Sequence, residues 1–129
     1  MHATLKRLEE LFDRDYPVNH HRPPGRGPAM GRYAGDVYYS GGAYFFSTLG
    51  AAEFCFRTAQ ASRDSHSWIA RGDAYLRTTR AYTAPNGDLS EQFDKQSGEQ
   101  TSAKQLAWSY AAFISCIAAR RRLIVEPAS

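Results

Sequence analysis

Residues 90–110 read SEQFDKQSGEQTSAKQLAWSY, a stretch in which a polar, acid-bearing loop runs directly into a strongly apolar helix. Ser102 is followed three residues later by Gln105, which fits a capping box. The two side chains of a capping box satisfy backbone N–H groups of the first helical turn, so this pair predicts where the helix begins. The loop before it is therefore anchored at its C-terminal end.

The anchored loop carries the carboxylates of Glu91, Asp94 and Glu99. Trp108 follows about two turns into the predicted helix, on the side expected to face the surface on which the helix packs. Carboxylates beside an aromatic ring suggest sugar chemistry. From the residues alone, however, Glu91 is more commonly a solvated loop glutamate and Trp108 a core residue.

Outward from this stretch, hydrophobic periodicity predicts an all-α chain with helices at residues 4–14, 43–61, 66–83 and about 102–121. The first and third are amphipathic, whereas the second and fourth are apolar on nearly every side. The pattern is thus outer, inner, outer, inner. Two amphipathic helices cannot cover two apolar ones completely, which predicts either an oligomer or a piece of a larger helical architecture.

The helices are separated by a long loop at residues 17–40, rich in Pro and Gly, and by a second loop at residues 84–101, which opens with an Ala-Pro-Asn-Gly-Asp turn. The length of the first loop, counted over its irregular part at residues 17–31, favours a functional role over simple connection. Two adjacent histidines, His20 and His21, lack spaced partners and are a weak metal signal, so no metal site is expected. The length of 129 residues is typical of one domain.

Composition excludes several classes of function. The net charge of +3 does not form one basic stripe, and the triplet Arg120, Arg121 and Arg122 is expected to lie in the last helical turn, where cations favour the helix dipole. Nucleic-acid binding is therefore not expected. The two cysteines, Cys55 and Cys116, lie in apolar helical runs and are predicted to be buried free thiols.

No apolar run is long enough to span a bilayer, and the first residues lack the apolar region of an export signal. We therefore expect a soluble chain without membrane contact, and a cytoplasmic location is slightly favoured.

A second cluster of candidate residues lies in the segment GRYAGDVYYSGGAYFF at 31–46. Charged donors, a carboxylate and aromatic rings provide charge-assisted hydrogen bonds to hydroxyls and flat surfaces for sugar faces. The composition fits a saccharide site and a tyrosine-rich turn packed under a helix about equally well. The residues in question are Arg32, Asp36, Tyr38, Tyr39 and Tyr44.

Two stretches, GRYAGDVYYSGGAY and DLSEQFDKQSGEQTSAKQLAWSYAA, resemble glucoamylases of glycoside hydrolase family 15. The second match is the more specific, and the likeness extends over most of residues 3–120. The family fold is an (α/α)6 toroid of twelve alternating inner and outer helices. The resemblance implies that this chain is the C-terminal third of such a toroid, and that the missing N-terminal part of the same toroid is its partner.

The resemblance implies that Glu91 is the general base of an inverting exo-α-glucosidase that releases glucose from starch, maltooligosaccharides or other α-glucans. In such enzymes the base activates a water while a second carboxyl group protonates the leaving oxygen. Gln92 would orient the base and the water, and Trp108 would line the glucose pocket. The remaining implied substrate-binding residues are Arg32, Asp36, Tyr38 and Tyr44. No cofactor is implied.

The region of the family's general acid has no counterpart in this chain, and neither Glu53 nor Glu99 matches it. The resemblance therefore predicts a fragment that supplies the base but not the acid and is inactive alone. The linkage remains open among α-1,4, α-1,6 and trehalose-like. An alternative is a non-catalytic carbohydrate-binding or helical interaction module that keeps the aromatic pocket.

Overall fold

The computed structural model describes residues 2–36, 42–101 and 107–125. This part of the chain contains four α-helices, one short 3-10 helix and three two-residue strands. In chain order the elements are α1 (His2–Asp15), η1 (Pro17–Asn19), β1 (Ala43–Tyr44), α2 (Phe45–Ala61), α3 (Ser65–Tyr82), β2 (Gln92–Phe93), β3 (Gln100–Thr101) and α4 (Ala107–Val125). The predicted all-α class is confirmed.

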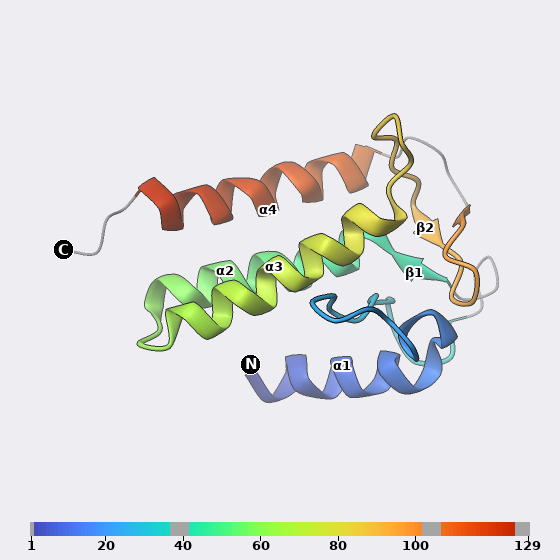
Figure 1. The fold of residues 1–129 in the computed structure, drawn as a ribbon, viewed down its shortest axis with the longest axis horizontal. Helices are drawn as coiled ribbons and strands as arrows, with labels where there is room; N and C mark the ends of the chain where they lie inside the picture. Colours follow the sequence, from blue (N-terminus) through green and yellow to red (C-terminus); the bar gives the residue numbers. More distant parts are fainter. Residues whose placement is uncertain (1, 37–41, 102–106, 126–129) are drawn as a thin grey trace.

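Helix α2 lies at the centre, with α3 and α4 packed against it and α1 on the side away from α4 (Figure 1). The α2 residues Leu49, Cys55 and Phe56 are fully buried in this core. Gly72 of α3 faces the same core, because a Cβ atom built there would lie 2.4 Å from the ring of Phe56. The absence of a side chain at Gly72 therefore lets α2 and α3 approach closely.

Helix α1 has one face toward solvent, as its amphipathic pattern predicts. Leu5 and Phe12 are buried, whereas Lys6 and Arg7 on the other face are exposed. A groove of about 330 Å³ remains between α1 and α2. It exposes apolar side chains of both helices together with the backbone at Gly50.

The two apolar helices are incompletely covered, as the sequence predicts. Gly50 of α2 is exposed and Phe54 is only partly buried. On α4 the exposed fractions are 65% for Trp108, 43% for Phe113 and 68% for Ile114. Trp108 therefore does not face the surface on which α4 packs, contrary to expectation. The described helices are too few to enclose both inner ones.

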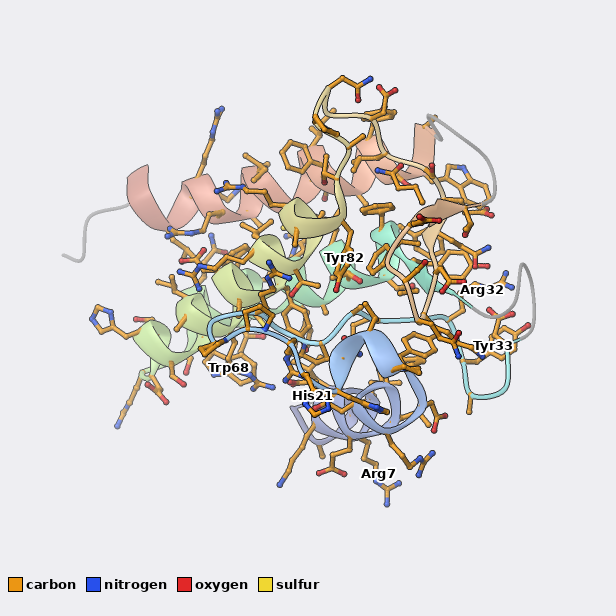
Figure 2. All side chains as sticks on the ribbon, turned by 45° about the vertical axis from the view of Figure 1, so that its right-hand side comes forward. Arg7, His21, Arg32, Tyr33, Trp68 and Tyr82 are labelled. Carbon is orange, nitrogen blue, oxygen red and sulfur yellow. The ribbon has the colours of Figure 1, made fainter. Side chains whose placement is uncertain are left out.

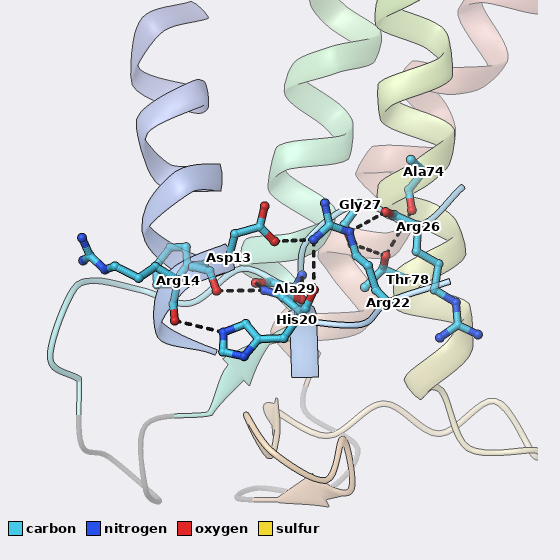
Figure 3. Close-up of polar contacts among 11 residues, drawn as sticks. Asp13, Arg14, His20, Arg22, Arg26, Gly27, Ala29, Ala74 and Thr78 are labelled. Atoms are coloured by element: carbon cyan, nitrogen blue, oxygen red, sulfur yellow. Dashed lines mark hydrogen bonds and ion pairs between the residues drawn. The ribbon is translucent and has the colours of Figure 1, made fainter. Parts of the chain in front are cut away.

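The predicted long loop is held against α1 and α3 by polar contacts (Figure 3). Asn19 donates to the carbonyls of Phe12 and Ala29 at 3.1 and 3.0 Å and accepts from the Ala29 amide at 2.7 Å. The Gly27 amide donates to the Ala74 carbonyl of α3 at 2.9 Å. Because its backbone groups are paired in this way, the part of the loop from Asn19 to Ala29 forms a layer against α1 and α3.

The strands form a small antiparallel sheet in the order β1-β2-β3, which is not predicted from the sequence. Strand β2 is central: Phe93 pairs with Ala43 of β1 and with Gln100 of β3. On the inner side, the Phe93 ring stacks on Tyr82 with centroids 4.5 Å apart and planes 15° apart. The sheet therefore joins the predicted site loop to the start of α2.

Helix α4 extends to Val125, beyond the predicted end at about residue 121, and the predicted capping box lies in residues 102–106, outside the described part. Only Arg122 of the arginine triplet lies in the last turn. Arg120 instead forms two hydrogen bonds with Asp73 of α3, at 2.9 and 3.1 Å. In the part of the chain that the structure describes, no helix is both long and apolar enough to span a bilayer.

Candidate functional site

The candidate site lies at the end of the molecule that carries the small sheet, and Glu91 immediately precedes its central strand. The Glu91 carbonyl accepts a hydrogen bond of 3.3 Å from the amide of Phe45, the first residue of α2. Its side chain is partly buried. The backbone on which the carboxylate stands is thus attached to the N-terminus of the central helix.

The residues before Glu91 are attached to α4. The Ser109 hydroxyl donates to the Ser90 carbonyl at 2.8 Å, and both side chains are buried. The Tyr110 hydroxyl accepts from the Leu89 amide at 3.2 Å. Two consecutive residues of α4 therefore fix two consecutive residues of the loop.

Arg32 and Asp36 form a bidentate pair next to this sheet, with Nε to Oδ2 at 2.8 Å and Nη2 to Oδ1 at 3.0 Å. The guanidinium lies 4.8 Å from the ring centroid of Tyr44 and 5.3 Å from that of Tyr33. Figure 2 shows Arg32 and Tyr33 together at this end of the molecule. Hydrogen bonding to Asp36 raises the pKa of Arg32 above its already high ordinary value.

The structure therefore brings together three of the predicted substrate-binding residues: Arg32, Asp36 and Tyr44. Tyr44 pairs with Gln92 in the sheet and is followed by Phe45, which binds the Glu91 carbonyl. The loop that carries Glu91 and the segment that carries Arg32 and Tyr44 therefore meet at the start of α2. Tyr38, also predicted, lies outside the described residues.

Trp108 is connected to this cluster by the ring of Phe46, which is not predicted from the sequence as a site residue. The Phe46 ring lies 5.1 Å from that of Tyr44 and 6.3 Å from that of Trp108, edge-on in both cases. In the sequence, only its place in the run of aromatic residues that begins at Tyr44 could have indicated Phe46 as a site residue. Trp108 contributes a largely exposed aromatic surface at the rim of the site.

Gln92 is fully buried, and its side-chain amide has no hydrogen-bond partner among the described residues. A Cβ atom at Gly42 would lie 3.1 Å from Gln92 Oε1 and 2.6 Å from the Phe93 carbonyl oxygen. The glycine therefore allows strand β2 and this amide to approach the chain before β1. A role for Gln92 in orienting the base and the water remains a prediction.

Residues 2–36, 42–101 and 107–125 contain no group of three or more His, Cys, Asp or Glu side chains arranged to hold an ion. His20 contacts the Arg14 carbonyl through Nε2 at 3.0 Å. Cys55 and Cys116 are free and buried, as predicted.

Comparison with known proteins gives a consistent result. The model of "Glycosyl hydrolases family 15" matches residues 68–118. A glucoamylase of Neurospora crassa is 35% identical over 150 residues, covering 88% of this chain and 24% of the relative. The chain spans about a quarter of the length of this relative.

Solved structures agree with these sequence matches. The glucoamylase of Hormoconis resinae superposes with a TM-score of 0.83 at 30% identity, covering 98% of this chain and 28% of that one. The family 15 glucoamylase of Hypocrea jecorina also gives a TM-score of 0.83, at 28% identity, with 94% of this chain and 26% of that one covered. Sequence and fold therefore agree: the chain is similar to part of the catalytic domain of the glucoamylases of glycoside hydrolase family 15, which is an (α/α)6 barrel.

Proposed function

We propose that this chain supplies the general-base side of a glucoamylase-like active site, in which Glu91 deprotonates the water that hydrolyses an α-glucan from its non-reducing end. The observation that carries the proposal is the placement of Glu91. Its backbone is attached to the start of α2, beside the Tyr44 ring on which Arg32 stacks. A carboxylate whose backbone is hydrogen-bonded beside residues that carry a cation and aromatic rings suits a sugar ring and an attacking water.

In the proposed mechanism, Glu91 accepts a proton from a water positioned on one face of the terminal glucose. A second carboxyl group, about 6.5–9.5 Å away on the opposite face, protonates the glycosidic oxygen as the bond breaks. We assign that acid to the part of the barrel that lies outside this chain. Inversion follows because the water attacks from the side opposite the leaving group.

The other site residues have proposed roles that follow from their chemistry. Arg32, held by Asp36, donates hydrogen bonds to sugar hydroxyls, and Tyr44 shapes the floor beneath it. Trp108 offers an exposed ring against which a sugar face packs. Gln92 and Tyr38 are proposed to orient the water and to complete the pocket.

The partner that we propose is the remainder of the same (α/α)6 barrel. Trp108 and Ile114 leave an apolar face of α4 open, and the groove between α1 and α2 leaves a second one. Apolar faces of this kind are stabilised by burial against further helices. Assembly with the remaining helices would cover both faces and bring the acid opposite Glu91.

The test is reconstitution of this chain with a polypeptide carrying the remaining helices of a family 15 glucoamylase, followed by measurement of glucose release from maltooligosaccharides. Glu91→Gln is expected to lower kcat by at least about 10²-fold, because it removes an essential acid–base group. Glu99→Gln is the matched control, since Glu99 is an exposed glutamate of the same loop. Equal turnover in both variants would contradict the assignment of the base.

Calorimetry on the isolated chain tests the alternative. Binding of maltose without hydrolysis, both alone and after reconstitution, would favour a non-catalytic sugar-binding module, whose aromatic surface at Trp108 is open to solvent.

A further inference from the structure

We propose that Gln100 is the positioning residue of this site: its side-chain amide holds the segment that leads into Glu91 and thereby fixes where the base stands. The inference rests on the proposed function of Glu91. It concerns a residue of strand β3 that neither the sequence pattern nor the family resemblance singled out.

The Gln100 side chain makes four hydrogen bonds. Oε1 accepts from the Ser90 amide at 2.8 Å and from the Ser90 hydroxyl at 2.8 Å. Nε2 donates to the Tyr82 carbonyl at 3.0 Å and to the Asp88 carbonyl at 2.9 Å. A primary amide has two acceptor lone pairs and two N–H groups, so the full capacity of this side chain is used.

This pattern also defines the orientation of the amide. Two donors face one of its ends and two carbonyl oxygens face the other, so the reverse orientation would place N–H against N–H and oxygen against oxygen. Only glutamine, at this side-chain length, offers both kinds of group in this geometry. An uncharged donor and acceptor pair is therefore specified at position 100.

The four bonds attach strand β3 to three points along the stretch from residue 82 to residue 90. Tyr82 ends α3, Asp88 lies in the turn after it, and Ser90 directly precedes Glu91. On its other sides this segment is held by Ser109 and Phe45 through backbone carbonyls. Gln100 attaches the same segment to the end of α3 through its hydrogen bond to the Tyr82 carbonyl.

The consequence for catalysis is geometric. A general base must reach a water within hydrogen-bond distance, and a misplacement of about 1 Å can cost about 10²-fold in rate. Gln100 makes no proposed contact with substrate, so it acts through the backbone at Ser90. Its loss should therefore affect turnover more than substrate binding.

The test uses Gln100→Glu, which keeps the size of the side chain but turns an oxygen toward the Tyr82 and Asp88 carbonyls. Gln96→Glu is the matched control, because Gln96 is an exposed glutamine of the same loop and undergoes the same change of charge. Gln100→Met is the second variant. It keeps a similar length without adding charge and covers the case in which buried charge unfolds the chain.

The first measurement is amide hydrogen exchange at Ser90 in this chain. We expect exchange at least about 10-fold faster in Gln100→Met than in the wild type, and no change in Gln96→Glu. Unchanged exchange at Ser90 in a folded Gln100 variant would overturn the proposal, whatever the activity of the protein.

The second measurement is made on the reconstituted enzyme. We expect kcat to fall by about 10²-fold in the Gln100 variants, with KM changed less than about threefold. Loss of binding with unchanged kcat would overturn a positioning role. Absence of activity in every reconstituted sample would instead count against the proposed function, while the exchange experiment still decides whether Gln100 holds Ser90.

Discussion

The guanidinium of Arg32 and the carboxylate of Asp36 meet edge to edge, with two hydrogen bonds of 2.8 and 3.0 Å. The Asp36 side chain is only 2% exposed, whereas that of Arg32 is 35% exposed. The buried acid therefore holds a partly exposed cation in one plane above the Tyr44 ring. Bidentate pairing of this kind gives geometric specificity as well as attraction.

We expect Asp36→Asn to lower the urea midpoint of the chain. Asparagine offers one acceptor where the carboxylate offers two, and its NH₂ group would face a guanidinium N–H. The measurement is urea unfolding followed by circular dichroism. Asp15→Asn is the control, because the Asp15 and Arg14 pair is exposed and such pairs contribute little. A midpoint equally unaffected by both changes would contradict the structural role of Asp36.

We expect substitution by alanine to have opposite effects on the free energy of unfolding at two helical glycines, Gly72 and Gly50. Gly72→Ala should destabilise the chain by a net amount of about 1 kcal/mol. The added Cβ would lie 2.4 Å from the buried Phe56 ring, and such overpacking costs about 1–3 kcal/mol, against about 1 kcal/mol gained in helix propensity.

Gly50→Ala is the matched experiment. It should stabilise the chain by about 1 kcal/mol, because nothing lies within 4 Å of the added Cβ and only the propensity gain remains. Free energies of unfolding from urea titrations check both values. Two changes of the same sign would show that the packing of α2 against α3 differs from that described.

The site loop predicts a dependence of stability on acid pH. Asp94 Oδ1 accepts from the amides of Ser97 and Gln96 at 2.9 and 2.8 Å, and these hydrogen bonds lower the pKa of Asp94. Because the folded-state pKa lies below the unfolded value of 3.8, Asp94 contributes stability above that pH and loses it as pH falls through the folded pKa.

Asp94→Asn isolates this contribution, since the amide oxygen can still accept both bonds but does not titrate. We expect the stability difference between wild type and variant to be constant above about pH 5 and to shrink below about pH 4. Thermal unfolding across pH 3 to 7 measures it. If the stability of wild type and variant differed by the same amount at every pH in this range, the lowered pKa of Asp94 would be contradicted.

The buried thiols should be nearly inert in the folded chain. Burial raises the pKa of Cys55 and of Cys116 to about 12 each. At pH 8 the thiolate fraction is then on the order of 10⁻⁴, about 10³-fold below that of an unperturbed cysteine. Reaction with an aromatic disulfide reagent should be correspondingly slow until urea unfolds the chain. Rapid labelling of the folded protein would contradict this burial.

The four helices could be predicted from the sequence because their signal is local. The 3.6-residue spacing of apolar side chains placed the third helix at 66–83, and the structure places it at Ser65–Tyr82. The strands could not be predicted, because each has two residues and no measurable period. Their pairing joins residues as distant as Ala43 and Phe93, which only the folded chain brings together.

Some residues of the candidate site could likewise be predicted from the sequence, whereas others are recognised only in the folded chain. Arg32 and Asp36 stand four residues apart, so their neighbourhood was visible in the sequence, and the family resemblance singled out Glu91. Phe46 and Gln100 were not predicted for the site, because their roles depend on which ring or carbonyl another segment presents. The exposure of Trp108 was also mispredicted, since helical periodicity cannot tell whether a partner helix is present.

By itself, therefore, the sequence determined the helices and the resemblance to glycoside hydrolase family 15 on which the prediction for Glu91 rests, because residue spacing and motif order are properties of the chain. Only the tertiary structure decided how the Glu91 backbone is held. The Phe45 amide, the Ser109 hydroxyl and the Gln100 amide reach it or its neighbour from three different elements. Hydrogen-bond partners distant in sequence are selected by packing, and packing exists only in the folded chain.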